Sequence, residues 1–328
     1  MTSLSVIVPV YNDRENFAKC LDALEKSLLN DYQLIIVDDG SGDGSGEVAK
    51  NRCDHFVRLD RNMGQSAARN HGARLANTKL LFFLDADVMV EPDTLGLILA
   101  EFSANPDISA LFCSYQANTP PKNFTSQYKN LQHHFTHKIA RREAATFCGG
   151  FGAIRRAVFL ESGGFKEDMR FMEDVDLGYR LHQAGHRILL CPSIQLTHSK
   201  QYSLGSLIKS DVFQRALPWT RLMLKQKIYH NDLNTSSNNV VSVAIVFLMI
   251  VALFFHRQGS WGFLLPQLGL LLALLILNFR FLAFLREVRG NLFALRAVPM
   301  MFLQYAYSGI GLALGILAHL RDRVGKHG

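Results

Sequence analysis

The stretch Leu80-Leu81-Phe82-Phe83-Leu84-Asp85-Ala86-Asp87 decides the fold, because five apolar residues run straight into two carboxylates that one residue separates. A short continuous apolar run of this kind is typical of a strand buried on both faces of a sheet. Leu4–Val10 and Leu34–Val37 repeat the pattern, and the second also ends in an acidic turn, Asp38-Asp39-Gly40-Ser41. Val57–Leu59 predicts a fourth, weaker strand.

Helical patterns separate these strands. One contains Phe17, Leu21, Leu24 and Leu28 at helix spacing, and another covers about Gln65–Ala76. Short apolar strands that alternate with helices predict a mostly parallel α/β sheet. Such sheets bind ligands where strands end and loops begin, and the carboxylates of this half of the chain fall at those ends.

The pattern loosens past Phe102, and fewer elements are predicted there. Phe147–Ile154 indicates a Gly-rich strand, Val175–Ala184 a helix closed by Gly185, and Ile188–Cys191 a strand. Within this region Glu173-Asp174 precedes the predicted helix. These acids either complement the helix dipole or supply a general base to a pocket.

Composition narrows the function classes. The net charge is +7, which suits nucleic acid, an anionic membrane surface or an anionic substrate. Nucleic-acid binding is disfavoured because the chain lacks interleaved aromatics and any known module. The five cysteines are odd in number and form no CxxC pair, which favours a reducing compartment over a disulfide framework.

The last third of the chain predicts membrane attachment. Three stretches carry no charge and approach the length of a transmembrane helix, namely Leu233–Phe255, Gln258–Phe279 and Ala297–Ala318. The link between the second and third holds four arginines, so the positive-inside rule places it in the cytoplasm beside the N-terminal domain. Three spans leave the C-terminal end outside, although Arg321, Arg323 and Lys326 favour the inside. A third segment that re-enters or lies in the interface is therefore the alternative.

A basic amphipathic segment precedes these stretches. One helical face is apolar and the other basic, the apolar residues being Leu204, Leu207, Ile208, Val212, Phe213 and Leu217. This pattern favours a helix in the membrane interface over one packed on a core. We therefore expect a catalytic domain over 1–200, interfacial helices over 201–232, a transmembrane region of about three helices over 233–320 and a basic tail over 321–328.

The two strand-end turns are the strongest chemical signals. Asp85 and Asp87 at the end of a buried strand can both reach one hard cation, which in turn neutralises a diphosphate. Alone, such a D-x-D is also found in ordinary solvated loops. Asp38-Asp39 alone also fits a common turn that feeds a helix. Two such turns on strands that can be neighbours favour a shared site.

Together these features resemble the family 2 glycosyltransferases with the GT-A fold, over about two-thirds of the chain. The residues that carry the resemblance are Val6-Ile7-Val8-Pro9-Val10-Tyr11-Asn12, Ile36-Val37-Asp38-Asp39-Gly40-Ser41, Asn62-Met63-Gly64, Ala68-Arg69-Asn70, Phe83-Leu84-Asp85-Ala86-Asp87, Gly149-Gly150, Gly163-Gly164-Phe165 and Glu173-Asp174-Val175-Asp176-Leu177. The resemblance implies a Rossmann-like nucleotide-sugar-binding domain, followed here by an α-helical transmembrane region.

The resemblance also implies roles for single residues. Pro9 and Tyr11 line the nucleobase and ribose pocket, and Asp39 accepts a hydrogen bond from the base, usually uracil. Asp85 holds ribose or sugar. The further substrate-binding residues are Asn62, Arg69 and Glu173, the ligands of Mg²⁺ or Mn²⁺ are Asp87 and His198, and the catalytic base is Asp174.

The acceptor follows from the membrane region and the base. Processive relatives carry a Q-x-x-R-W motif, whereas Gln214-Arg215-Ala216-Leu217-Pro218-Trp219 departs from that spacing. We therefore expect inverting transfer from a UDP-sugar to a hydroxyl of a lipid or lipid-linked sugar, on the cytoplasmic face of a membrane such as the bacterial inner membrane. The alternatives are sugar transfer to polyprenyl phosphate, which needs no base, and a non-catalytic membrane protein that binds sugar nucleotides.

Overall fold

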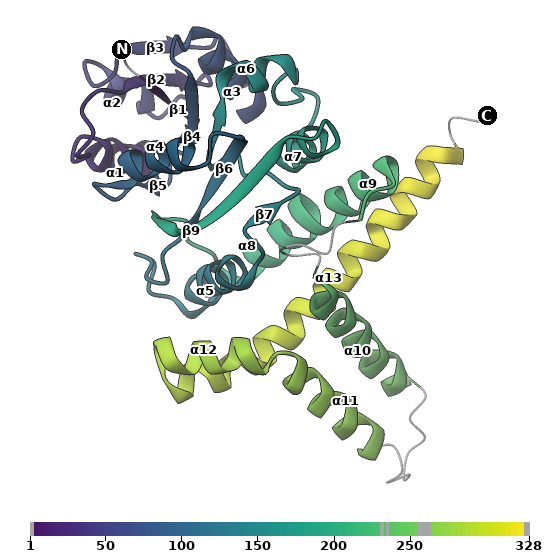
Figure 1. Cartoon of the computed structure of the whole chain (residues 1–328). Coiled ribbons are helices and arrows are strands. Elements are labelled where there is room, and N and C mark those ends of the chain that lie inside the picture. The colour runs from purple at the N-terminus through teal and green to yellow at the C-terminus, as the bar shows by residue number, and fades with distance from the viewer. Residues whose placement is uncertain (1–2, 230–232, 234–235, 255–263, 325–328) are drawn as a thin grey trace. The chain divides into compact units, whose positions relative to one another are not determined.

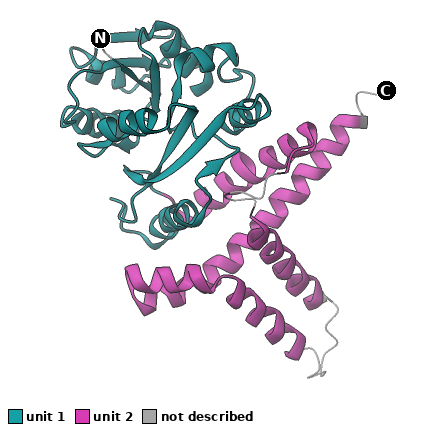
Figure 2. Cartoon of the chain, viewed as in Figure 1, with its two compact units in different colours: residues 1–201 teal, residues 202–328 magenta. Residues whose placement is uncertain are grey.

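The computed structural model describes residues 3–229, 233, 236–254 and 264–324. The chain divides into two compact units, 1–201 and 202–328 (Figure 2). The first unit is a sheet with helices around it, and the second is helical (Figure 1).

The sheet of the first unit has the strand order β3-β2-β1-β4-β8-β6-β9-β5, with β7 paired to β9. The strands are β1 (Leu4–Val10), β2 (Gln33–Asp38), β3 (His55–Arg58), β4 (Leu80–Leu84), β5 (Val88–Met89), β6 (Ile108–Tyr115), β7 (Glu143–Ala144), β8 (Phe151–Arg155) and β9 (Arg187–His198). Its helices are α1 (Arg14–Leu24), α2 (Ser45–Ala49), α3 (Gln65–Leu75), α4 (Thr94–Ala104), α5 (Phe124–Ile139), α6 (Arg156–Glu161) and α7 (Glu173–Gln183).

The expectation of a mostly parallel sheet holds for β1 to β4, and β6 also pairs in parallel with β9. β1 pairs in parallel with β2 and β4, and β2 with β3. β8 then lies antiparallel to both β4 and β6, which makes the whole sheet mixed. The sequence did not predict the direction of β8, because an apolar run indicates burial and carries no information on strand direction.

Several element ends differ from the predicted ones. Leu28 was expected on the first helix, but α1 ends at Leu24 and Leu28 is 75% exposed. The Gly-rich strand was expected from Phe147 and begins at Phe151 instead. The reason lies at Gly152, where a Cβ would sit 2.2 Å from the carbonyl oxygen of Cys148, so the chain folds back on itself before the strand starts.

The second unit contains α8 (Leu204–Lys209), the π-helix η1 (Ser210–Ala216), α9 (Leu217–Gln226), α10 (Ser237–Phe254), α11 (Leu264–Leu277), α12 (Phe279–Arg289) and α13 (Asn291–Val324). Among the described residues, Asn291–Arg323 of α13 is the one helix long and apolar enough to cross a membrane by itself. α11 and α12 satisfy that test only as a pair bent by 63°. The predicted stretches Leu233–Phe255 and Gln258–Phe279 lie partly outside the described residues. The link at 256–257 and Lys326 lie wholly outside them.

Gly178 offers a test of the packing that holds α7 on the sheet. A Cβ at Gly178 would lie 2.3 Å from the backbone nitrogen of Phe147, whereas a Cβ at Gly96 in α4 would meet nothing within 4 Å. We predict that Gly178→Ala destabilises the fold by about 1–3 kcal/mol through overpacking. Gly96→Ala should instead stabilise it by about 0.5–1 kcal/mol, since alanine is the better helix former. Urea unfolding of both variants measures this, and equal stabilities would contradict the packing.

Candidate functional site

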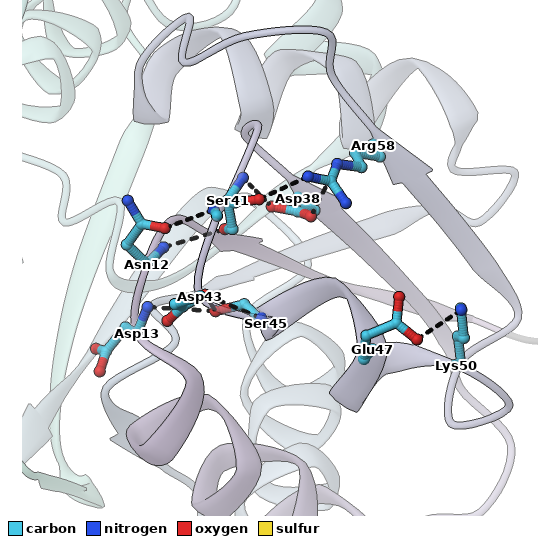
Figure 3. Close-up of polar contacts among 10 residues, drawn as sticks. Asn12, Asp13, Asp38, Ser41, Asp43, Ser45, Glu47, Lys50 and Arg58 are labelled. Carbon is cyan, nitrogen blue, oxygen red and sulfur yellow. Dashed lines mark hydrogen bonds and ion pairs between the residues drawn. The ribbon is translucent and has the colours of Figure 1, made fainter.

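The turn after β2 is fastened to the end of β1 by a polar network (Figure 3). The backbone N–H of Asn12 donates to Oγ of Ser41 at 3.0 Å, and the N–H of Gly42 donates to Oδ1 of Asn12 at 2.8 Å. Asp38 is fully buried and accepts the N–H of Ser41 at 2.9 Å, while Nε of Arg58 lies 3.7 Å from its Oδ2. Asp38 therefore shapes the turn rather than facing a ligand.

Asp39 points to a different segment, the loop that leads into α3. Its two carboxylate oxygens accept the backbone N–H groups of Met63 and Gly64 at 2.7 and 2.9 Å. Burial raises the pKa of Asp39, against the effect of these two hydrogen bonds. Asp39 thus joins the ends of β1 and β2 to the loop that contains Asn62.

The other residues predicted for the base and ribose lie on the open side of this region. Tyr11 is 48% exposed, Asn62 is exposed and Pro9 is partly buried. Gly40 allows the close approach of the neighbouring loop, because at its φ of 77° a Cβ would lie 2.8 Å from the carbonyl carbon of Arg61. These exposed side chains are free to meet a flat ligand.

Arg69 is the centre of a second cluster. It comes from α3, its side chain is only 2% exposed, and its guanidinium lies over the ring of Phe165 with 5.4 Å to the ring centre. Nη2 donates to Oδ1 of Asp85 at 2.6 Å, and Nη1 donates to Oε1 of Glu173 at 2.9 Å. The carboxylates outweigh the effect of burial and raise the pKa of Arg69. One buried cation therefore links the ends of β4 and α3 to the start of α7.

The loop before β8 lies directly against these carboxylates. The carbonyl oxygen of Gly150 accepts the N–H of Asp85 at 2.9 Å, and a Cβ at Gly150 would lie 2.4 Å from Oδ2 of the same residue. The N–H of Gly149 donates to Oδ2 of Asp174 at 3.1 Å. A Cβ at either position would press on the side chains of this cluster, and the Gly-Gly pair contacts both Asp85 and Asp174.

Glu173 and Asp174 differ in what they bind. Glu173 accepts from Arg69 and from the side-chain amide of Gln65, whereas Asp174 accepts the backbone N–H groups of Gly149 and Val175. Burial raises the pKa of Glu173 to about 7, with Asp174 adding to the rise and Arg69 opposing it. Burial also raises the pKa of Asp174, again against Arg69.

Asp87 and His198 meet on the other side of Asp85. β5 pairs with β9 so that Val88 is opposite His198, and Nε2 of His198 lies 3.4 Å from Oδ2 of Asp87. Burial opposes ionisation of Asp87, but His198 and Lys200 outweigh it and lower its pKa. Within the described parts of the chain, no group of three or more His, Cys, Asp or Glu residues forms a ready metal cage.

Tyr115 is a residue of this site that sequence reasoning missed. Its ring stacks on His198 with centres 4.5 Å apart and planes 5° apart, and it also contacts the ring of Phe151 at 4.5 Å. Thr119 adds a hydrogen bond of 2.7 Å to the carbonyl oxygen of His198. The signal was weak because β6, which carries Tyr115, is fully buried and shows no alternation.

The contribution of the Arg69 cluster to the free energy of unfolding can be tested by substitution. We predict that Arg69→Leu costs about 3–5 kcal/mol, because the buried carboxylate of Glu173 is left without a cation. The double variant Arg69→Leu/Glu173→Gln should recover a substantial part. Arg187, whose partners Asp107 and Glu143 are exposed, is the matched control. Arg187→Leu should cost only about 0–1 kcal/mol. Urea unfolding compares the four proteins, and equal costs for the two single arginine variants would overturn the assignment.

Comparison with known proteins identifies the family and the fold. The profile of "Glycosyl transferase family 2" matches residues 5–163. Glycosyltransferase AglE of Haloferax volcanii is 38% identical over 217 residues, which are 63% of this chain and 69% of that protein. An uncharacterized glycosyltransferase of Haemophilus influenzae is 30% identical over 188 residues, or 55% of this chain and 62% of that one.

Solved structures show the same fold. The mannosyltransferase PcManGT from Pyrobaculum calidifontis, in complex with GDP-Man and Mn²⁺, superimposes with a TM-score of 0.58 at 17% identity. The match covers 97% of this chain and 87% of that one. The mixed sheet with its surrounding helices is therefore the GT-A fold, and the chain belongs to glycosyltransferase family 2.

Proposed function

We propose that this chain transfers a sugar from a nucleoside diphosphate sugar to a hydroxyl group of a membrane lipid or lipid-linked saccharide, with inversion at the anomeric carbon. The observation that carries the proposal is that the Gly149-Gly150 loop touches both Asp85 and Asp174. A carboxylate with raised pKa thus lies beside the acidic strand end expected to hold the donor.

Asp174 is the general base in this proposal, and Glu173 is not. Glu173 is 2% exposed and is occupied by Arg69 and Gln65, so it positions rather than reacts. Each oxygen of Asp174 holds one backbone N–H and keeps lone-pair capacity for an incoming hydroxyl. A pKa raised toward the working pH makes this carboxylate a better base.

The reaction is a single displacement. The acceptor oxygen attacks the anomeric carbon while its proton passes to the carboxylate of Asp174. The bond from that carbon to the diphosphate oxygen breaks at the same time, and the diphosphate leaves with the electron pair. Asp85, held by Arg69 and Gly150, orients the sugar or ribose on the donor side.

The base and ribose of the donor would lie at the other end of the site. Asp39 would accept a hydrogen bond from the base with a lone pair left over by Met63 and Gly64, while Tyr11 and Pro9 line the pocket. Asn62 sits on the loop that Asp39 fastens. We propose a UDP-sugar as the donor, on the family resemblance; the solved mannosyltransferase is bound to GDP-Man, so both nucleotides belong in the assay.

The residues next to Asp85 fit a hard divalent cation. Asp87 and His198 offer a carboxylate oxygen and an imidazole nitrogen 3.4 Å apart. Mg²⁺ is usually bound by one or two carboxylates together with substrate phosphates, so a full protein cage is not required. Asp87 and His198 would therefore hold Mg²⁺ or Mn²⁺, which when bound supplies positive charge against the leaving diphosphate.

The second unit would attach the enzyme to its acceptor. α13 is long and apolar, and α10 and α11 are shorter apolar helices. We propose a membrane protein whose catalytic unit faces the cytoplasm, so that a lipid-borne hydroxyl reaches Asp174 from the membrane surface. The curated relatives extend beyond the match, since the chain spans 62% of the H. influenzae protein and 33% of YibD from Escherichia coli.

The cation can be tested by removal. We expect EDTA to abolish sugar transfer, and Mg²⁺ or Mn²⁺ to restore it. Asp87→Ala should remain inactive at every metal concentration, whereas Asp107→Ala, at an exposed ion pair, should respond as the parent does. Circular dichroism confirms that both variants are folded. Full transfer in excess chelator would contradict the cation assignment.

The base can be tested by Asp174→Asn, which keeps the shape and removes the basicity. With a hydroxyl acceptor we expect turnover to fall by about 10²–10⁴-fold, because that is what a general base contributes. Nucleotide affinity should stay near that of the parent, since Asp39 and Asp87 carry it. Turnover and affinity are measured on the true acceptor, with Asp107→Asn as control. Near-normal turnover would point instead to polyprenyl phosphate, whose oxygen is already ionised.

A further inference from the structure

The C-terminal half of α13 packs lengthwise against η1 and α9 (Figure 1). The hydroxyl of Tyr307 donates to Oδ2 of Asp211 at 2.8 Å. One turn on, a Cβ at Gly311 would lie 2.5 Å from Cβ of Ala216. The two helices therefore run in the same direction with their backbones in close contact.

The contact continues to the end of both helices. A Cβ at Gly315 would lie 2.6 Å from Cβ of Thr220, and Arg221 forms an ion pair with Asp322. The contacts on α13 thus extend from Tyr307 to Asp322, which is about 22 Å of helix. Helices that touch over this length share one environment, because a helix that crosses a membrane meets an in-plane helix only near one point.

The partner of α13 is unsuited to the membrane interior. Leu204–Gln226 contains five charged residues, Lys209, Asp211, Arg215, Arg221 and Lys225. Asp211 and Arg215 pair with each other at 2.8 Å. Arg221 is 45% exposed and pairs with Asp322 of α13. A charged residue at the centre of a membrane helix is energetically unfavourable. η1 and α9 therefore stay at the membrane surface.

Both helices nevertheless carry exposed apolar side chains suited to lipid. On α13 these are Ile310, Leu312, Ile316, Leu317 and Leu320, and on η1 and α9 they are Phe213 and Leu224. Basic residues, Lys225 and Arg323 among them, lie at the ends of the same two helices. An apolar face bordered by basic residues fits the boundary between acyl chains and anionic headgroups.

A polar cluster shows where the other helices meet α13. The hydroxyl of Tyr305 lies 2.7 Å from Oδ1 of Asn278 and 3.3 Å from Oδ1 of Asn239, and Nδ2 of Asn278 donates to Oγ of Ser242 at 3.1 Å. Asn239 and Ser242 lie in the first turns of α10, and Asn278 directly follows α11. The start of α10 and the end of α11 thus both lie beside Tyr305 of α13.

We infer that the C-terminal half of α13 lies in the plane of the membrane surface beside α9, and that α10 and α11 are the described helices that enter the lipid. Arg323 then lies on the same side of the membrane as unit 1. The first expectation from the sequence was three spans with residues 321–323 outside, and its alternative was a third segment that re-enters or lies in the interface. The inference rests on the membrane attachment proposed above but is independent of sugar transfer.

Cysteine accessibility tests the side. Asp60→Cys marks unit 1 and Arg323→Cys marks the end of α13, each in the full chain, and the chain without an added cysteine gives the background of its own five thiols. Right-side-out and inverted membrane vesicles are treated with a membrane-impermeant maleimide, and labelling is read by mass spectrometry. We expect both positions to be labelled in the same vesicle orientation. Labelling in opposite orientations would overturn the inference, as would recovery of the chain in the soluble fraction.

Disulfide crosslinking tests the helix pair in the membrane. Oxidation should join Thr220→Cys to Gly315→Cys, whose Cβ atoms lie within disulfide reach after a small shift. Thr220→Cys with Leu317→Cys, which is 62% exposed, is the matched control and should stay unjoined. Absence of the first crosslink, or equal yields of the two, would show that α9 and α13 are not paired. Neither experiment uses a sugar nucleotide, so loss of sugar transfer leaves both results intact.

Discussion

The buried guanidinium of Arg69 is the constraint on which the site depends. A cation with 2% exposure is tolerated only when carboxylates meet it with good geometry, and Asp85 and Glu173 do so from two segments far apart in the chain. This requirement fixes the end of β4 against the start of α7. It also leaves little space beside Gly149 and Gly150, whose backbone N–H and carbonyl groups contact Asp174 and Asp85.

Each acidic motif contains two carboxylates that make different contacts. Asp38 is enclosed by its own turn, while its neighbour Asp39 reaches across to the loop before α3. Glu173 neutralises Arg69, while its neighbour Asp174 keeps lone pairs for another proton. In Asp85-Ala86-Asp87 the first carboxylate is held by Arg69 and the second lies near His198. In each motif the two carboxylates thus have different contacts.

The sequence could predict the strands that end at Asp38 and Asp85, because each is a local apolar run that stops at an acidic turn. It could not predict the direction of β8 or the position of Tyr115, since both depend on segments far apart in the chain. The resemblance assigns different roles to Glu173 and Asp174, and the contact that distinguishes the two carboxylates is that of Glu173 with Arg69, 104 residues away in the chain. Local periodicity carries no information about contacts of that range. The glycines were visible as a motif, whereas the atoms that exclude a side chain there are visible only in three dimensions.

The helical unit shows the same limit in another form. α13 passes a test for a membrane span by length and composition, and yet Gly311 and Gly315 lie against Ala216 and Thr220 along a helix that carries five charges. Hydropathy averages over all faces of one helix, so it is blind to what one face contacts. Small residues at four-residue spacing allow backbones to approach, and they do so equally well in lipid and at its surface. On the inference drawn above, the environment of α13 follows from that of its partner, and the charges of Lys209, Arg221 and Lys225 disfavour deep insertion of that partner.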